Sequence, residues 1–250
     1  MREFLMKYMP PDYSLHGKQI DDLIFMVHVL MAILFVGWGL YFLYVLYRFS
    51  EKRSPRADYI GVRTHASSYI EAGVAAVEII LLVVISIPAW YRWATPPDKS
   101  KNPLEIRVVA EQFAWNVHYP GPDGVFGRTE PRLVGPDNPL GLDREDPAGR
   151  DDITTINRLN LPVGKPAIIF LSSKDVVHSL GLPQMRVKQD AIPGLIQPVW
   201  FTPMRTGQWD IACSQLCGIA HFRMKGVYEI QSQADFDAFL KEEASYLQQQ

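Results

Sequence analysis

Two long apolar runs near the start of the chain limit its fold more than any other feature. The first extends from Leu23 to Phe49, with no charged side chain between Asp22 and Arg48. The second extends from about Ile70 to Trp93. About 20 apolar residues cross a bilayer as a helix, which satisfies its own backbone hydrogen bonds in lipid. The sequence therefore predicts a transmembrane helical hairpin over residues 20–95, with spans of about 23–49 and 70–93.

The connection between the two spans is basic and short. After Arg48 it carries four further cations, Lys52, Arg53, Arg56 and Arg63. Short loops rich in Lys and Arg stay on the cytoplasmic side of a membrane, so both ends of the hairpin should emerge on the outer face. Residues 1–19 lack the apolar core and cleavage site of a signal peptide, so we expect an N-terminal outer-face segment followed by a retained first span.

Ionisable side chains interrupt both spans. Glu71 and Glu78 are seven residues apart and so share a face of the second helix. An intramembrane carboxylate is a functional candidate, although a position at the membrane interface explains Glu71 equally well. His28 in the first span is expected to face the helix bundle rather than to bind a ligand.

From Leu104 onward the apolar residues follow the period of β-strands. Residues 104–119 alternate as one half-buried strand whose register slips near Glu111. Further short strands are expected within residues 159–171, 199–201, 208–212 and 226–230. Such spacing is typical of an all-β sandwich or barrel of the Greek-key type, so we predict one β-domain over residues 96–231.

Two segments of this half of the chain differ from the strands. Residues 125–152 are too rich in Pro, Gly and Asp for a core and are expected to form a surface loop with a function or a partner. Residues 232–250 begin with a capping box, Ser232 to Asp235, and carry apolar residues at helical spacing. They predict a C-terminal amphipathic helix.

The loop Cys213-Ser-Gln-Leu-Cys-Gly-Ile-Ala-His-Phe-Arg-Met224 gathers two thiols, an imidazole and a thioether, and holds both cysteines of the chain. Sulfur and imidazole ligands favour copper or zinc over hard cations. A disulfide would close a very small ring and leave His221 and Met224 without a role. A structural zinc bound by two Cys and two His remains an alternative, but it does not need Met224. A single blue-copper ion needs only one thiolate, whereas two thiolates suit a dinuclear copper centre.

This loop resembles the dinuclear copper (CuA) loop of haem–copper oxidase subunit II, Cys-Ser-Glu-x-Cys-Gly-x-x-His-x-x-Met. An upstream stretch, Ser173-Lys-Asp-Val-Val-His178-Ser, resembles the segment that supplies the remaining histidine. The resemblance implies a cupredoxin-like copper domain after the membrane hairpin. It assigns His178, Cys213, Cys217 and Met224 to one copper, and Cys213, Cys217, His221 and the Gln215 carbonyl to the other.

By the same resemblance, the chain is subunit II of a respiratory oxidase in a bacterial-type inner membrane, with the copper domain on the periplasmic face. It would accept single electrons from cytochrome c or a similar donor, soluble or within a supercomplex, and pass them to subunit I. Haems are then expected only in subunit I, with subunit III as a further partner. A net charge of −2 gives no reason to expect nucleic acid. A copper-delivery protein and a structural zinc module are the alternatives.

The resemblance also implies roles for the side chains of four residues. Phe113 and Trp115 match the aromatic stretch where electrons enter, although relatives have Trp-Tyr-Trp where this chain has Phe-Ala-Trp, so we expect Trp115 to serve mainly in packing. Glu71 matches the mouth of a proton pathway. Gln215 replaces a Glu that helps hold magnesium or manganese in relatives, and a neutral amide is a poor ligand for such ions. We therefore expect that ion to be absent or weakly held.

Overall fold

The computed structural model describes residues 2–56, 59–61 and 64–247, so the predicted cation Arg63 lies outside the described residues. The chain divides into two compact units. One unit combines Met1–Asp21 with Pro96–Gln250, and the other is Asp22–Thr95. The segment before the first span thus belongs structurally to the β-domain.

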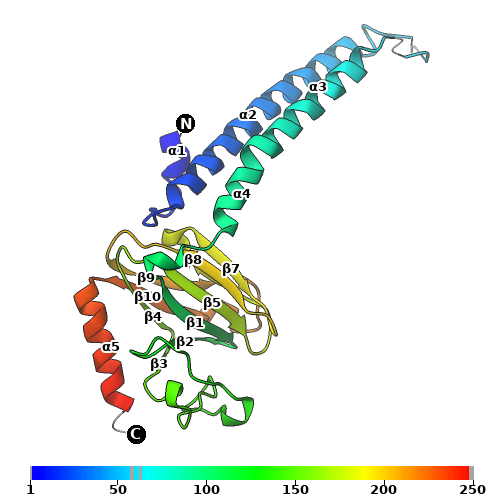
Figure 1. Cartoon of the computed structure of the whole chain (residues 1–250). Coiled ribbons are helices and arrows are strands. Elements are labelled where there is room, and N and C mark those ends of the chain that lie inside the picture. Colours follow the sequence, from blue (N-terminus) through cyan, green and yellow to red (C-terminus); the bar gives the residue numbers. More distant parts are fainter. Residues whose placement is uncertain (1, 57–58, 62–63, 248–250) are drawn as a thin grey trace. The chain divides into compact units, whose positions relative to one another are not determined.

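The second unit contains two helices that are long and apolar enough to cross a membrane (Figure 1). Helix α2 (Gly17–Arg48) has a mean hydropathy of 2.4 over its most apolar window. The second helix, Ala66–Ala94, has a mean hydropathy of 2.5. Both extend several residues beyond the predicted apolar runs at their N-terminal ends, because polar residues continue a helix readily once an apolar stretch has formed it.

The second helix contains a wide turn in its middle. It consists of α3 (Ala66–Ile80), a π-helical turn η1 (Leu81–Ser86) and α4 (Ile87–Ala94). Pro88 explains this local change, since a proline has no N–H to donate and its ring clashes with the carbonyl four residues earlier. The Ile87 N–H reaches back five residues to the Leu82 carbonyl, which is the hydrogen-bond pattern of a π-turn.

The β-domain is a sandwich of two five-stranded sheets with strand orders β3-β2-β1-β5-β8 and β4-β10-β9-β6-β7. Neighbouring strands are antiparallel except for the pairs β1/β5 and β10/β4. The predicted β-sandwich is therefore confirmed. Its strands are β1 (Leu104–Glu111), β2 (Ala114–Tyr119), β3 (Ile153–Ile156), β4 (Arg158–Pro162), β5 (Ala167–Ser173), β6 (His178–Leu182), β7 (Val187–Ala191), β8 (Gln197–Phe201), β9 (Gly207–Cys213) and β10 (Lys225–Gln231).

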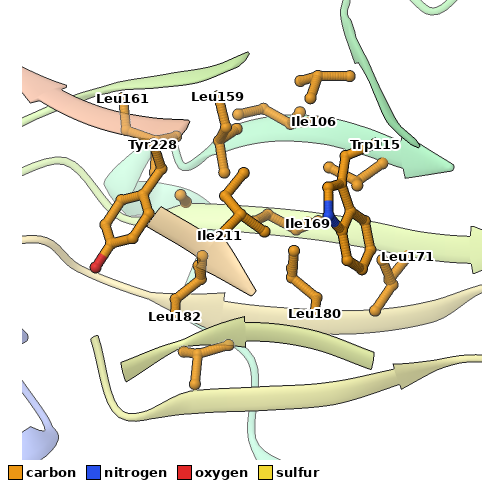
Figure 2. Close-up of a cluster of buried hydrophobic side chains, with 14 of the residues drawn as sticks. Ile106, Trp115, Leu159, Leu161, Ile169, Leu171, Leu180, Leu182, Ile211 and Tyr228 are labelled. Carbon is orange, nitrogen blue, oxygen red and sulfur yellow. The ribbon is translucent and has the colours of Figure 1, made fainter. Parts of the chain in front are cut away.

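The core lies between the two sheets, where alternate residues of the strands meet. Figure 2 shows Trp115 of β2 at one end of this cluster and Tyr228 of β10 at the other, with Ile211 and Leu180 between them. All four side chains are at most 1 % exposed. Burial of this kind contributes about 1.5–3 kcal/mol per large apolar side chain, so the inward faces hold the two sheets together.

The prediction of one strand over residues 104–119 is wrong. The chain folds back at residues 112–113, and β1 and β2 form an antiparallel hairpin in which Glu111 pairs with Ala114. The alternation of apolar residues shifts by one position at the turn, from Ala110 to Phe113, and the turn contains no Gly, Pro, Asn or Asp. The apparent slip in register near Glu111 was the reversal of the chain itself.

The segment before the first span packs on the β-domain as an N-terminal strap, residues 10–16. Its backbone exchanges hydrogen bonds with the domain, from Tyr13 N to Gln184 O (2.8 Å), from Leu15 N to Thr202 O (3.0 Å) and from Met204 N to Tyr13 O (2.8 Å). The Tyr13 ring stacks on Trp209 with ring centroids 5.3 Å apart. Beyond the strap, Arg186 donates to both carboxylate oxygens of Asp21, at 2.7 and 3.0 Å, and both side chains are nearly buried.

The two predicted segments outside the sandwich both make specific contacts with it. Helix α5 (Gln233–Leu247) starts at the predicted capping box, where the Asp235 N–H donates to Ser232 Oγ, and buries Phe236 and Phe239. The loop between β2 and β3 is tied down by a buried pair, His118 Nε2 to Asp152 Oδ2 at 2.6 Å. Asp152 also accepts the backbone N–H groups of Gly121 and Gly127.

Candidate metal centre

Adjacent strands of one sheet bring the candidate ligands together. His178 is the first residue of β6 and Cys213 the last residue of β9, and the two strands pair with Leu180 opposite Cys213. Beyond β9 the chain turns through Cys217 and a short 3₁₀ turn, η6 (His221–Arg223), before β10 begins. The ligand loop is therefore the connection between two paired strands, and its position is fixed at both ends.

The five predicted side-chain ligands converge on one small volume. The Cys213 and Cys217 sulfurs are 3.7 Å apart. Cys217 Sγ lies 3.5 Å from His221 Nδ1 and 3.7 Å from Met224 Sδ. His178 Nδ1 lies 3.1 Å from Met224 Sδ and 4.0 Å from Cys213 Sγ. Each of these ligand atoms thus lies 3.1–4.0 Å from another ligand atom, so the five side chains could share one metal site.

One backbone carbonyl joins this group. The Gln215 carbonyl oxygen lies 3.2 Å from Cys213 Sγ. The Gln215 side chain is exposed, so its amide is free to face a partner while its carbonyl faces the sulfurs. The oxygen therefore completes a donor set of two thiols, two imidazoles, a thioether and a carbonyl.

The site is buried on one side and open on the other. His178, Cys217 and Met224 are at most 4 % exposed, whereas Cys213 and His221 are partly exposed. Trp115 closes the inner side, with its ring centroid 6.3 Å from that of His178. A metal ion held here would be shielded from bulk water on the side of the core and reachable from the side of the loop.

Asp175 orients the buried histidine. Its Oδ1 lies 2.9 Å from His178 Nε2, and its Oδ2 accepts the Gln112 N–H at 2.7 Å. Burial by itself would raise the pKa of Asp175, but the hydrogen bonds from His178, Gln112 and Val176 outweigh it and hold the pKa below its usual value. The ionised carboxylate keeps the proton on Nε2 and leaves Nδ1 as the free donor atom.

The turn between β1 and β2 packs against the ligand loop. The Gln112 side chain donates to the Cys217 carbonyl at 2.7 Å. Gly218 has a φ of +137°, and a Cβ at this position would lie 3.2 Å from the Phe113 ring and 2.7 Å from Gln112 Nε2. Only glycine suits both this backbone conformation and this contact.

Burial, and to a smaller extent the neighbouring Cys213, together raise the pKa of the Cys217 thiol to about 11. Without a metal this thiol keeps its proton at neutral pH. A metal ion must therefore displace that proton when it binds.

The chemistry of the donor set fits copper. Thiolate and thioether ligands select soft or borderline metals, and imidazole suits both copper and zinc. A tetrahedral zinc site is filled by four ligands of the Cys and His type, so it would leave Met224 and the Gln215 carbonyl without a function. Two coppers sharing the two sulfurs would use all six donors.

The remaining predicted residues lie in different places. Trp115 is fully buried, so a donor protein cannot touch it, in agreement with its expected packing role. Phe113 is partly exposed beside the ligand loop. Glu71 lies in α3, which belongs to the other structural unit, and its side chain is exposed. The structure therefore brings Phe113 to the metal centre, whereas Glu71 belongs to the other structural unit.

Asp175 and Gln112 were missed as contributors to the site. A signal for Asp175 exists in the sequence, because it stands three residues before His178 within the quoted motif. No local signal marks Gln112, which reaches the ligand loop only because the chain reverses immediately after it.

Comparisons with known proteins agree with one another. Residues 104–231 match the family described as cytochrome C oxidase subunit II, periplasmic domain. The alternative cytochrome c oxidase subunit 2 of Bradyrhizobium diazoefficiens is 31 % identical over 228 residues, which cover 91 % of this chain and 81 % of that protein. The cytochrome c oxidase subunit 2 of Cereibacter sphaeroides is 29 % identical over 247 residues, covering 93 % and 78 %.

Solved structures include a similar domain. The periplasmic domain of subunit II of cytochrome oxidase (CoxB) of Bradyrhizobium japonicum is 27 % identical, with a TM-score of 0.43. The match covers 58 % of this chain and 95 % of that domain.

Proposed function

Because this chain belongs to the cytochrome c oxidase subunit II family, we propose that its metal centre is a dinuclear copper site that relays single electrons to the haem-bearing subunit of the oxidase. The observation that carries this proposal is the convergence of two thiols, two imidazoles, a thioether and a carbonyl. Cys213, Cys217 and the other donors would hold two copper ions, which would supply a centre that takes up and releases one electron with little rearrangement of its ligands.

The distances support the division of ligands that the family resemblance implies. His178 and Met224 are neighbours and would serve one copper, together with both sulfurs. His221 lies beside Cys217, and the Gln215 carbonyl lies beside Cys213, so these two would serve the other copper. Each ligand therefore lies next to the other ligands that are assigned to the same ion.

The protein's own residues prepare the site for this task. Asp175 holds the His178 ring in one orientation, and the buried side chains of Cys217 and Met224 exclude water from the inner half. Gln112 ties the ligand loop to the hairpin of β1 and β2. A rigid, dry ligand set limits the movement that accompanies each change of charge.

Electron paramagnetic resonance of the full chain, purified in detergent and loaded with copper, tests the proposal. We expect two coppers per chain and hyperfine structure from two equivalent copper nuclei. Cys217→Ser should leave at most one copper and a mononuclear spectrum. Splitting by a single copper nucleus in the fully loaded wild-type chain would refute the dinuclear site.

The same sample separates the alternatives. A structural zinc module would take up zinc and remain colourless. A copper-delivery site would hold colourless Cu(I) and release it to an acceptor protein. A dinuclear centre with one shared electron would be intensely coloured and would retain its copper during dialysis against a weak chelator.

The partners follow from membership of this family. We propose association with oxidase subunits I and III, with haems confined to subunit I, and reduction by cytochrome c or another one-electron carrier. Residues 190–194, Asp-Ala-Ile-Pro-Gly, match a segment that lies against subunit I in relatives. The helices α2 and Ala66–Ala94 would anchor the chain in the inner membrane, with the copper domain on the periplasmic face.

Glu71 is proposed as the mouth of a proton pathway. An exposed carboxylate within an apolar helix is costly unless a partner or water solvates it, which favours a contact with subunit I. Glu71→Gln in the assembled oxidase should slow turnover while the copper spectrum stays the same. An unchanged turnover rate would assign Glu71 to the membrane interface.

The side chain of Gln215 should affect only a second metal site, the one for magnesium or manganese, and not the copper site. Its carbonyl serves the copper site, but its amide offers a hard dication one oxygen and no charge. We propose that the magnesium or manganese of relatives is absent or weakly held. Metal analysis of the purified oxidase after mild chelation tests this, and a retained stoichiometric ion would contradict it. Gln215→Glu should create or tighten the ion site without altering the copper spectrum.

A further inference from the structure

Three exposed or partly exposed apolar side chains surround the place where an electron would enter the metal centre. Phe113 packs against Gly218, and the next residue of the ligand loop, Ile219, is 92 % exposed. Val176 is 37 % exposed. It lies close to the turn between β1 and β2, since the Asp175 carboxylate accepts the N–H groups of both Val176 and Gln112. We call Phe113, Val176 and Ile219 the Phe113 patch.

The carboxylates next to the Phe113 patch are already engaged within the protein. Glu111 pairs with Lys174 at 2.5 Å and also accepts a hydrogen bond from Asn116 at 2.9 Å. Asp175 is committed to His178 and to two backbone N–H groups. Lys174 neutralises Glu111, and hydrogen bonds occupy the oxygens of Asp175, so neither carboxylate is free to form a direct ion pair with a partner protein.

The one arginine of the ligand loop, in contrast, is not paired within the described part of the protein. Arg223 is exposed, and it makes no ion pair with any residue in the part of the chain that the structure describes. Its charge would repel a docking face rich in lysine. The Phe113 patch is thus flanked by two carboxylates that are bonded within the protein and by one positive charge, Arg223, that is not paired among the described residues.

We infer that the physiological donor is a one-electron carrier protein whose docking face is apolar and carries no ring of lysines. This inference rests on the proposed function, because it takes the Phe113 patch as the place where electrons arrive. An exposed apolar patch beside a functional centre marks a partner contact. Electrostatic steering speeds association and makes it sensitive to salt, whereas apolar contacts do neither.

The experiment uses the assembled oxidase and two protein probes. One is a strongly basic mitochondrial cytochrome c, and the other is a bacterial c-type cytochrome of acidic surface charge. We expect the acidic cytochrome to have the higher kcat/KM at low ionic strength. Its kcat/KM should change less than about threefold between low and physiological salt, because no steering is lost. A preference for the basic cytochrome, with a tenfold or greater loss of rate on adding salt, would overturn the inference.

Variants provide the second measurement. Ile219→Ser should lower kcat/KM for the acidic cytochrome about tenfold, the effect of losing roughly half of one buried isoleucine contact. Val125→Ser is the matched control, since Val125 is 54 % exposed in the loop that follows the opposite end of β2, and it should change kcat/KM less than twofold. Glu111→Gln should also change it less than twofold. An Ile219→Ser effect no larger than that of Val125→Ser, or a larger effect of Glu111→Gln, would overturn the inference.

A small reductant keeps the two proposals apart. Tetramethylphenylenediamine reduces exposed copper without a protein docking step. If the wild-type oxidase fails to oxidise this reductant although copper is bound, the relay function itself has failed. If it oxidises the reductant but shows the salt dependence of a steered reaction with the basic cytochrome, only the inference about the donor has failed.

Discussion

Single residues of the ligand loop are constrained by two requirements at once. Gly218 must adopt a φ of +137° and must leave room for the Phe113 ring and the Gln112 amide. Cys217 must be buried to shield the centre, yet burial raises the pKa of the thiol that has to lose its proton. Each conflict has a measurable consequence.

Replacing Gly218 with Ala should disturb both the copper centre and its neighbour. The new Cβ would meet Gln112 Nε2 at 2.7 Å, so the hydrogen bond from Gln112 to the Cys217 carbonyl should break. We expect a loss of about 1–3 kcal/mol in the free energy of unfolding and altered copper hyperfine coupling. Gly164→Ala is a control with a φ of +77°, which is also positive, but with open space around it. Equal effects of the two variants on the copper spectrum would show that the contact is unimportant.

Copper loading should depend on pH through Cys217. Below its pKa of about 11 the thiol is protonated, so copper binding must release its one proton. The apparent affinity should therefore rise about tenfold per pH unit for this one proton, between roughly pH 6 and 8. Competition with a chelator of known affinity at several pH values measures the slope. A slope of zero would mean that the thiol is already ionised before copper arrives.

The candidate metal ligands could be recognised in the sequence because all but one stand within twelve residues, whereas their division between two coppers came from the family resemblance. The remaining ligand, His178, was identified through family resemblance and not through spacing. Asp175 and Gln112 could not be assigned, because their roles depend on which strands become neighbours in the folded sheet. Contacts between distant segments are set by the whole fold.

At the scale of elements, the sequence pattern predicted most strands of the sandwich but missed β3, β6 and β7, and it did not place the turn between β1 and β2. The pattern of residues 104–119 is the same for one long strand and for a tight hairpin without Gly or Pro, so alternation alone could not place the turn. The N-terminal strap was predicted only as a polar segment. Its bonds to the domain are made by backbone groups, which the sequence pattern does not reveal.

The nearly buried pair of Asp21 and Arg186 should matter for stability. Asp21→Asn would leave the Arg186 guanidinium with its bonds to the Pro10 and Pro183 carbonyls but no counter-charge. We expect the free energy of unfolding of the β-domain to fall by about 3 kcal/mol, the lower end for a broken buried ion pair. Near-ultraviolet circular dichroism during denaturant titration measures it. Asp21→Asn combined with Arg186→Met should recover part of the loss, and a purely additive double variant would show that the two side chains do not interact.

At the scale of the whole molecule, the chain is two units held by different forces. The β-domain depends on a core that excludes water, whereas the helices Asp22–Thr95 have no buried core of their own and depend on an apolar solvent. This division was predictable from the two apolar runs. The assignment of residues 1–21 to the β-domain was not.

Unfolding in detergent should therefore occur in two stages. Rising denaturant should abolish the near-ultraviolet signal of the β-domain while much of the far-ultraviolet helical signal persists, since micelles stabilise the apolar helices. Circular dichroism in both wavelength ranges on the same sample tests this. Coincident loss of both signals would show that the units unfold cooperatively.

The π-turn of the second membrane helix changes which side chains share a side of that helix. Glu71, Glu78 and Arg92 are spaced by multiples of seven residues, which in a uniform α-helix would place them within one broad stripe. An α-helix lags by about 20° per heptad, and a π-turn that takes up one additional residue adds a lag of about 100°. Over the three heptads from Glu71 to Arg92 the two lags sum to roughly 160°. The carboxylates and the guanidinium therefore point to nearly opposite sides, so one neighbouring helix could contact the acids or the base, but not both.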